Sequence, residues 1–181
     1  MFTNNEIALI NEFVTRYTTF EQNVILYKRF GRYFGNDLVM TLTQSNYING
    51  EPTLSTAAMK GLCLKHFENG VKTVAYFRTI ESNSEICTVA TRRTDELQYD
   101  IPEHTATFTI EDAKKRNLLG KWAWQTMPAV MLKKRATSDL IRDVYPDIFF
   151  NVYDDCEITD SIKDDIKYTQ TKQLPYDSTN S

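Results

Sequence analysis

The feature that most constrains the fold is one long helix with two well-marked ends. Pro128 suits the first turn of a helix, where its missing N–H costs nothing. No residue from Ala129 to Val144 breaks a helix before Pro146 ends it. At about 100° per residue, four apolar residues share one face of this helix, and we expect that face to lie on the core. They are Val130, Leu140, Ile141 and Val144.

The opposite face holds Met131, Lys134, Arg135, Ser138 and Arg142, and the cations among them, Arg135 and Arg142 with Lys134 beside them, form a basic stripe. The rise from Arg135 to Arg142 is roughly 10 Å along the axis, and the stripe can therefore meet a phosphate backbone. The stretch from 114 to 142 contains eight Lys or Arg residues and one acid, Asp139. Charge alone favours a solvated helix face over a nucleic-acid interface.

The remaining pattern predicts an α+β fold of one domain, with a small, mostly antiparallel sheet of hairpins packed against helices. We expect helices over 4–20, capped by Asn4, and over 21–34, 56–67, capped by Ser55, and 111–118. Extended segments are expected over 39–48, 72–79, 85–93 and 105–110, with hairpin turns at Asn49-Gly50 and at 82–84. Arg92 and Arg93 then point to opposite faces of their strand.

Charge is distributed unevenly along the chain. Residues 1–142 carry eighteen Lys or Arg against fifteen Asp or Glu, whereas residues 143–181 carry three against nine. A basic body with an acidic end permits a local cationic groove despite the net charge of −3. We expect a core domain over 1–157 and an acidic, polar and mobile tail over 158–181.

Common catalytic and cofactor patterns are missing from the sequence. Cys63, Cys87 and Cys156 are widely spaced and form no CxxC pair, so we expect reduced thiols. His66 and His104 are the only histidines, and structural hydrogen bonds explain them better than a zinc site or a catalytic triad. No glycine-rich loop ends in Gly-Lys-Ser or Gly-Lys-Thr, so nothing predicts ATP or another cofactor.

Several motifs occur together in an order typical of one family. They are the runs 47–55 and 108–114, Gly120-Lys121, Trp124-Gln125, Pro128, Met131-Leu132, Arg135-Ala136, Arg142, Pro146-Asp147 and Tyr153. Over roughly residues 38–157 the chain thereby resembles the RecT and Redβ single-strand annealing proteins of phages. Glu81, Ser82, Glu85, Cys87, Arg92 and Arg93 are similar to that family's second hairpin. One departure is Phe149-Phe150-Asn151, where many relatives have small residues.

The resemblance implies ATP-independent binding of single-stranded DNA and annealing of complementary strands in phage recombination, without enzyme chemistry. A cationic groove offsets the repulsion between backbones and positions a strand without reading its sequence. Trp122 or Trp124 either stacks on bases or braces the helix, and bracing is expected above all for Trp124. The candidate DNA-binding residues are Lys121, Lys133, Lys134, Arg135, Arg142, Arg92, Arg93 and Trp122. Lys60 and Lys65 can extend the groove, although a solvated helix face explains them equally well.

The resemblance also predicts partners and location. These are single-stranded DNA, the annealed duplex, further copies of the chain in a ring or helical filament, and a phage exonuclease. Larger members of that family contact single-strand binding proteins through a C-terminal region, and we expect this chain to stop before it. No apolar run is long enough to span a membrane and no signal peptide is evident, so we expect the cytoplasm of a bacterial host.

Two other functions remain open from the sequence. Asp154, Asp155, Glu157 and Asp160 could bind Mg²⁺ in a metal-dependent nuclease, although an acidic surface explains that run better. A non-catalytic structural oligomer of the same fold, without annealing activity, is the other alternative.

Overall fold

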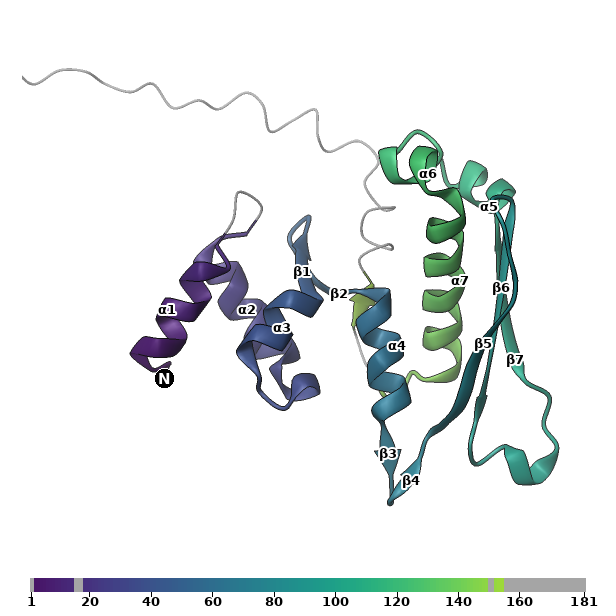
Figure 1. The fold of residues 1–181 in the computed structure, drawn as a ribbon, viewed down its shortest axis with the longest axis horizontal. Coiled ribbons are helices and arrows are strands. Elements are labelled where there is room, and N and C mark those ends of the chain that lie inside the picture. Colours follow the sequence, from purple (N-terminus) through teal and green to yellow (C-terminus); the bar gives the residue numbers. More distant parts are fainter. Residues whose placement is uncertain (1, 15–17, 150–151, 155–181) are drawn as a thin grey trace, which may run out of the picture.

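A three-stranded antiparallel sheet forms one side of the fold, and one long helix lies along it (Figure 1). The computed structural model describes residues 2–14, 18–149 and 152–154. The strands are β5 (Val74–Ser82), β6 (Ile86–Arg93) and β7 (His104–Thr109), in that order across the sheet. Helix α7 (Pro128–Val144) packs mainly on β6 and β7 and has the predicted ends.

Helix α7 is covered on two sides, because α4 (Thr56–Lys65) packs against it as well as the sheet (Figure 1). The expected core face is correct for Leu140, Ile141 and Val144 but wrong for Val130, which is 49% exposed. The opposite face is not open either, since Arg135 and Ser138 are 3% and 0% exposed. A helix between two layers buries more of its circumference than one apolar stripe.

Tyr145 joins the end of α7 to the sheet. Its side chain is fully buried, and its hydroxyl lies 2.7 Å from Thr91 Oγ1. Thr91 Oγ1 already donates to the carbonyl oxygen of Tyr76 at 2.7 Å, so the Tyr145 hydroxyl is the donor in this pair. Burial raises the pKa of Tyr145 to about 12, which keeps this hydroxyl protonated at neutral pH.

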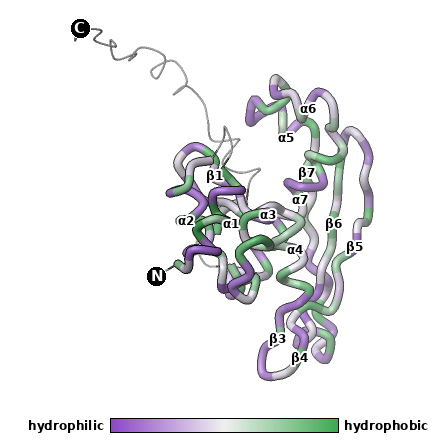
Figure 2. Tube along the Cα trace, turned by 60° about the vertical axis from the view of Figure 1, so that its left-hand side comes forward, coloured by the Kyte–Doolittle hydropathy of each residue, from purple (hydrophilic) through white to green (hydrophobic). Residues whose placement is uncertain are grey.

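The two ends of the sheet carry different short elements. At one end lie α5 (Ile110–Lys115) and α6 (Trp122–Thr126) (Figure 1). At the other end lie the hairpin of β3 (Phe67–Glu68) and β4 (Val71–Lys72) and a 3₁₀ helix, η2 (Leu97–Tyr99). Hydrophilic stretches run along β5 and through the β3–β4 turn (Figure 2).

The N-terminal part packs helices against a second small sheet. Its helices are α1 (Asn4–Glu12), α2 (Phe20–Phe30), the 3₁₀ helix η1 (Gly31–Phe34) and α3 (Leu38–Gln44). Its sheet consists of β1 (Ser45–Ile48), β2 (Glu51–Leu54) and β8 (Tyr153–Asp154). Strands β1 and β2 are antiparallel, whereas β2 and β8 are parallel. The rings of Tyr33 and Phe149, 5.9 Å apart, connect these helices to the chain after α7.

The predicted extended segment over 39–48 is wrong for most of its length, because residues 38–44 form α3. Asp37 caps this helix by accepting from the backbone N–H of Met40 at 2.8 Å. Leu38 and Leu42 are buried where α3 packs on α2, and this burial outweighs the strand preference of the β-branched residues. The first helix is capped by Thr3 rather than Asn4, and it ends at Glu12 rather than at residue 20 as predicted.

The other predicted elements agree with the structure within a few residues. Asn49 and Gly50, with φ of 54° and 87°, form the β1–β2 turn, and Ser55 caps α4. The hairpin over 72–93 is present as β5 and β6. The α+β class with small, mostly antiparallel sheets is therefore confirmed. The predicted tail over 158–181 lies outside the described residues, and none of the described helices is long and apolar enough to cross a membrane.

The hydrogen-bond chain at Tyr145 predicts a graded loss of stability. Tyr145→Phe removes one donor and leaves the Thr91–Tyr76 bond intact, so the free energy of unfolding should fall by about 1 kcal/mol. Thr91→Val removes both bonds and leaves the buried Tyr145 hydroxyl without this acceptor, so it should cost about 2 kcal/mol. Urea denaturation of the two variants measures both values. Equal stability of Thr91→Val and wild type would contradict this account.

Candidate nucleic-acid interface

The predicted DNA-binding residues do not converge on one point. Lys121 and Trp122 lie before the first turn of α7, whereas Arg93 donates to the carbonyl oxygen of Val144 at the last turn. A helix of 17 residues separates these ends by about 25 Å. The candidates therefore divide into a group at the α6 end and a group at the far end of α7.

Arg93, at the far end, is engaged by the protein itself. Its guanidinium donates to both carboxylate oxygens of Asp147 and to the carbonyl oxygen of Val144, each at 3.1 Å. It also lies over the Tyr145 ring, with its central carbon 5.5 Å from the ring centroid. These contacts lock the chain after α7 onto the end of β6, which is a structural role.

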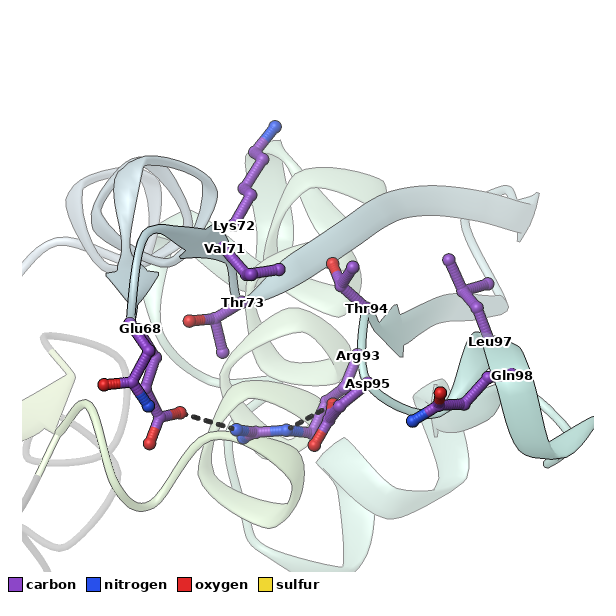
Figure 3. Close-up of a pocket in the computed structure, with 10 residues that line it drawn as sticks. Glu68, Val71, Lys72, Thr73, Arg93, Thr94, Asp95, Leu97 and Gln98 are labelled. Atoms are coloured by element: carbon purple, nitrogen blue, oxygen red, sulfur yellow. Dashed lines mark ion pairs between the residues drawn. The ribbon is translucent and has the colours of Figure 1, made fainter.

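Arg93 also forms the floor of an open pocket of about 590 Å³ (Figure 3). Its guanidinium lies between Glu68 and Asp95, with N–O distances of 4.0 Å and 3.5 Å. Val71 and Leu97 contribute apolar side chains to the lining. The described lining carries two cations, Arg93 and Lys72, and two carboxylates, Glu68 and Asp95. This balance gives the pocket no excess of positive charge for DNA.

Arg92 and Arg142 also bind backbone groups. Arg92 Nη2 is 3.5 Å from the carbonyl oxygen of Glu96, and its charge adds to the effect of Arg78 in lowering the pKa of Glu103. Arg92 and Arg93 thus reach different neighbours, as the strand alternation predicts. Arg142 Nη2 donates to the carbonyl oxygen of Val152 at 2.7 Å, which holds the segment leading into β8.

Arg135 is the most buried of the predicted residues. The side chain lies in the core beside the sheet, with its guanidinium carbon 5.6 Å from the centroid of Phe108. Arg116 approaches the same ring at 5.0 Å, and Trp124 packs against it at 6.1 Å. The expectation that Trp124 braces the core is confirmed, since it is 3% exposed. Arg135 has too little exposed surface to contact a phosphate in this conformation.

At the α6 end, cationic and aromatic groups face solvent. Trp122 is 70% exposed, in contrast to Trp124 one half-turn away. The exposed side chains of Lys114, Lys115 and Arg116 lie at the end of α5, next in the chain to α6. The capping box between Thr109 and Asp112 fixes where α5 begins. The count of Lys and Arg over residues 114–142 included these α5 cations. The sequence did not show that they and Trp122 share one end of the molecule.

The remaining candidates lie along this end and the first half of α7. Lys133 is exposed, whereas Lys121 and Lys134 are partly buried. Among the predicted residues, Trp122 and Lys133 are therefore the two with well-exposed side chains.

Other chemistry is poorly supported in the part of the chain that the structure describes. Burial raises the pKa of the Cys63 thiol to about 12, so at neutral pH it is protonated and a weak nucleophile. His66 is hydrogen-bonded to Thr73 and His104 to Glu96, both at 2.7 Å, as expected of structural histidines. No group of three or more metal-ligating side chains occurs among these residues. Asp155, Glu157, Asp160 and Cys156 lie outside them, as does the side chain of Asp154.

No family model, curated protein or solved structure matches this chain. The assignment of function therefore depends on the geometry above and on the sequence motifs.

Burial of Arg135 predicts that its substitution affects folding rather than DNA binding alone. Arg135→Ala removes a packed, buried side chain and should lower the free energy of unfolding by about 2 to 4 kcal/mol. Lys133→Ala, on the same helix but exposed, should change it by less than about 0.5 kcal/mol. Urea denaturation of both variants tests this contrast, and an Arg135→Ala variant as stable as Lys133→Ala would contradict it.

The Arg93–Asp147 pair predicts a specific acid response. Partial burial opposes ionisation of Asp147, but the hydrogen bonds and charge of Arg93 outweigh it, so the pKa of Asp147 is lowered. The ionised Asp147 carboxylate therefore contributes fully to stability above its unfolded-state pKa of about 3.9. This contribution is lost as the pH falls through its lower pKa in the folded protein.

Asp147→Asn should thus be less stable than wild type at pH 7, by about 1 kcal/mol, and the difference should shrink towards pH 2. Denaturation at a series of pH values measures this difference. If the difference in free energy of unfolding between the two proteins stays constant down to pH 2, the charge of Asp147 does not cause it.

Proposed function

We propose that this protein binds single-stranded DNA and anneals complementary strands without ATP. The observation that carries the proposal is Trp122, a tryptophan 70% exposed to solvent, which follows the exposed cations Lys114, Lys115 and Arg116 at the end of α5. Aromatic platforms within a positively charged surface are the usual means of binding single strands without sequence preference. The sequence motifs that resemble RecT and Redβ proteins support the same function.

The chemistry of annealing fits a site of this composition. Pairing two strands breaks no covalent bond, and its barrier is largely electrostatic repulsion between backbones. Lysines bind phosphates as point charges and release counterions, which offsets that repulsion. Stacking on Trp122 holds a base by its face and leaves its pairing edge available to a second strand.

The proposal includes assembly of several copies along one strand, in a ring or helical filament, as the resemblance implies. A single cationic end engages only a few nucleotides, and cooperative binding along the strand keeps a longer segment extended. A phage exonuclease that generates single strands is the partner that this activity requires upstream.

Annealing of two complementary fluorescent oligonucleotides, at low salt and without ATP, tests the function. We expect the wild-type protein to accelerate annealing. Trp122→Ala should weaken binding of oligo-dT by roughly 5- to 100-fold, since stacking contributes about 1 to 3 kcal/mol per base. Oligo-dT should also quench the fluorescence of Trp122, measured in a Trp124→Phe background that folds.

Tyr99→Ala is the matched control, because Tyr99 is an equally exposed aromatic residue, 70%, at the opposite end of the sheet beside Asp100. It should leave oligo-dT binding unchanged. If Trp122→Ala and Tyr99→Ala behave alike while wild type anneals, the function stands and the site lies elsewhere. If wild type neither binds oligo-dT nor accelerates annealing, the proposal is wrong.

A further inference from the structure

Strand β7 is an edge strand of the three-stranded sheet, and its outer side is open. Among the described strands only β6 pairs with it. Figure 1 shows β7 at the border of the sheet, with α5 following its end. An open edge presents a row of backbone N–H and C=O groups, so it is a template on which another strand can pair.

The hydrogen bonds at the end of β7 show which backbone groups face the open side. Residues of an antiparallel strand direct their backbone groups alternately to the two sides. The N–H of Ile110 donates to the carbonyl oxygen of Glu85 at 2.7 Å, in the position that continues the β6–β7 register. The N–H of Thr109 donates instead to the Asp112 carboxylate at 3.0 Å. Even-numbered residues of β7 therefore bond to β6, and odd-numbered residues turn their backbone groups outward.

Thr105 and Thr107 are the two positions that this pattern leaves open. Both are exposed, and on the outer side their backbone groups have no partner among the described residues. Phe108 is buried towards α7, so the side chain of Thr107 lies on the other face of the sheet, where its Oγ1 is 2.9 Å from Thr88 Oγ1. The open groups are therefore accessible to an approaching strand.

The two edges of the sheet differ in how they are protected. Strand β5 has two register shifts against β6, and its exposed half carries Arg78 and Glu81. Bulges and charged side chains of this kind discourage pairing with another chain. Strand β7 pairs with β6 without a register shift and has neither a charged residue nor a proline over residues 105–109. Strand β7 is therefore the edge suited to pairing.

We propose that β7 pairs antiparallel with β7 of a second copy of this chain, around a twofold axis at Ala106. In this register Thr105 of each copy lies opposite Thr107 of the other. Each of these two pairs exchanges both of its backbone hydrogen bonds, so the outward groups of both threonines are satisfied in both copies. The two sheets become one continuous sheet, and the contact does not depend on DNA.

The side chains at this edge also fit a second copy. Ala106 meets its own counterpart at the closely spaced, non-hydrogen-bonded position, where opposed Cα atoms are only about 4.5 Å apart and a small side chain is suited. The threonine pairs on the other face bring no like charges together. Because a twofold contact of this kind closes on itself, growth into a ring or filament under the proposed function would use another surface.

Cross-linking at the twofold axis tests the register. Ala106→Cys in a Cys156→Ser background places two thiols within the Cα separation that a disulfide allows, and Cys63 and Cys87 are buried. Mild oxidation should therefore give a covalent dimer on a non-reducing gel. Thr79→Cys in the same background is the matched control, since Thr79 is exposed on the opposite edge, and it should remain largely uncross-linked. Equal cross-linking of the two variants, or none with Ala106→Cys, would overturn the proposal.

Sedimentation velocity without DNA, over a series of protein concentrations, tests the dimer by a charge exchange. Wild type should form a species of twice the 21.0 kDa chain mass. The double variants Thr105→Lys/Thr107→Lys and Thr105→Glu/Thr107→Glu each put like charges opposite one another in both pairs, which should weaken dimerisation about 10-fold. An equimolar mixture of the two should dimerise again, because each lysine then faces a glutamate.

Thr79→Lys/Ser82→Lys is the control for added charge, since both residues are exposed on β5, and it should dimerise as wild type does. A wild-type protein that stays monomeric, or a mixture that associates no better than its separate components, would overturn the β7 contact. These results would leave the proposed function standing, because they are obtained without DNA. Conversely, a protein that dimerises through β7 but binds no oligo-dT would overturn the proposed function alone.

Discussion

Burial of α7 on two sides is the constraint on which the rest of the structure depends. The helix must fill the space between the sheet and α4, and its rotation about its own axis decides which charges reach solvent. Leu132, Ala136 and Leu140 are fully buried along it, and Tyr145 fixes its end to Thr91. Close packing of this kind permits one rotation, since turning the helix would bury its lysines or create cavities.

That rotation gives the basic residues of α7 different surroundings. Arg135 lies over an aromatic ring, Arg142 donates to a backbone carbonyl oxygen, and Lys134 is partly buried. Lys133 remains exposed on the same helix. The guanidinium group is planar, weakly hydrated and rich in donors, so it suits half-buried positions, whereas the strongly hydrated ammonium group favours solvent. A basic helix can thus supply internal connections and an external cationic surface at the same time.

Local signals predicted much of the fold and tertiary contacts decided the rest. Pro128 and Pro146 bounded α7, Asn49-Gly50 marked a hairpin, and Ser55 marked a cap, because each acts within a few residues. The helix over 38–44 was missed because burial against α2 outweighs the preferences of its own residues. Likewise, helical periodicity separated two faces of α7 but could not show that both would be covered. The sequence motif indicated a bracing role for Trp124, but no signal in the sequence showed that Trp122 would be exposed.

The arrangement of exposed groups bears on how a strand would be held in the proposed function. Trp122, Lys60 and Lys133 come from three helices, α6, α4 and α7, and the last two share one core with β5. A core of packed side chains fixes the separation of the cations that it carries, so their spacing does not adapt to each ligand. Fixed spacing suits a backbone, whose phosphates repeat regularly whatever the bases are. Under the proposed function, a strand is held by position along its backbone and its sequence is tested only by pairing between strands.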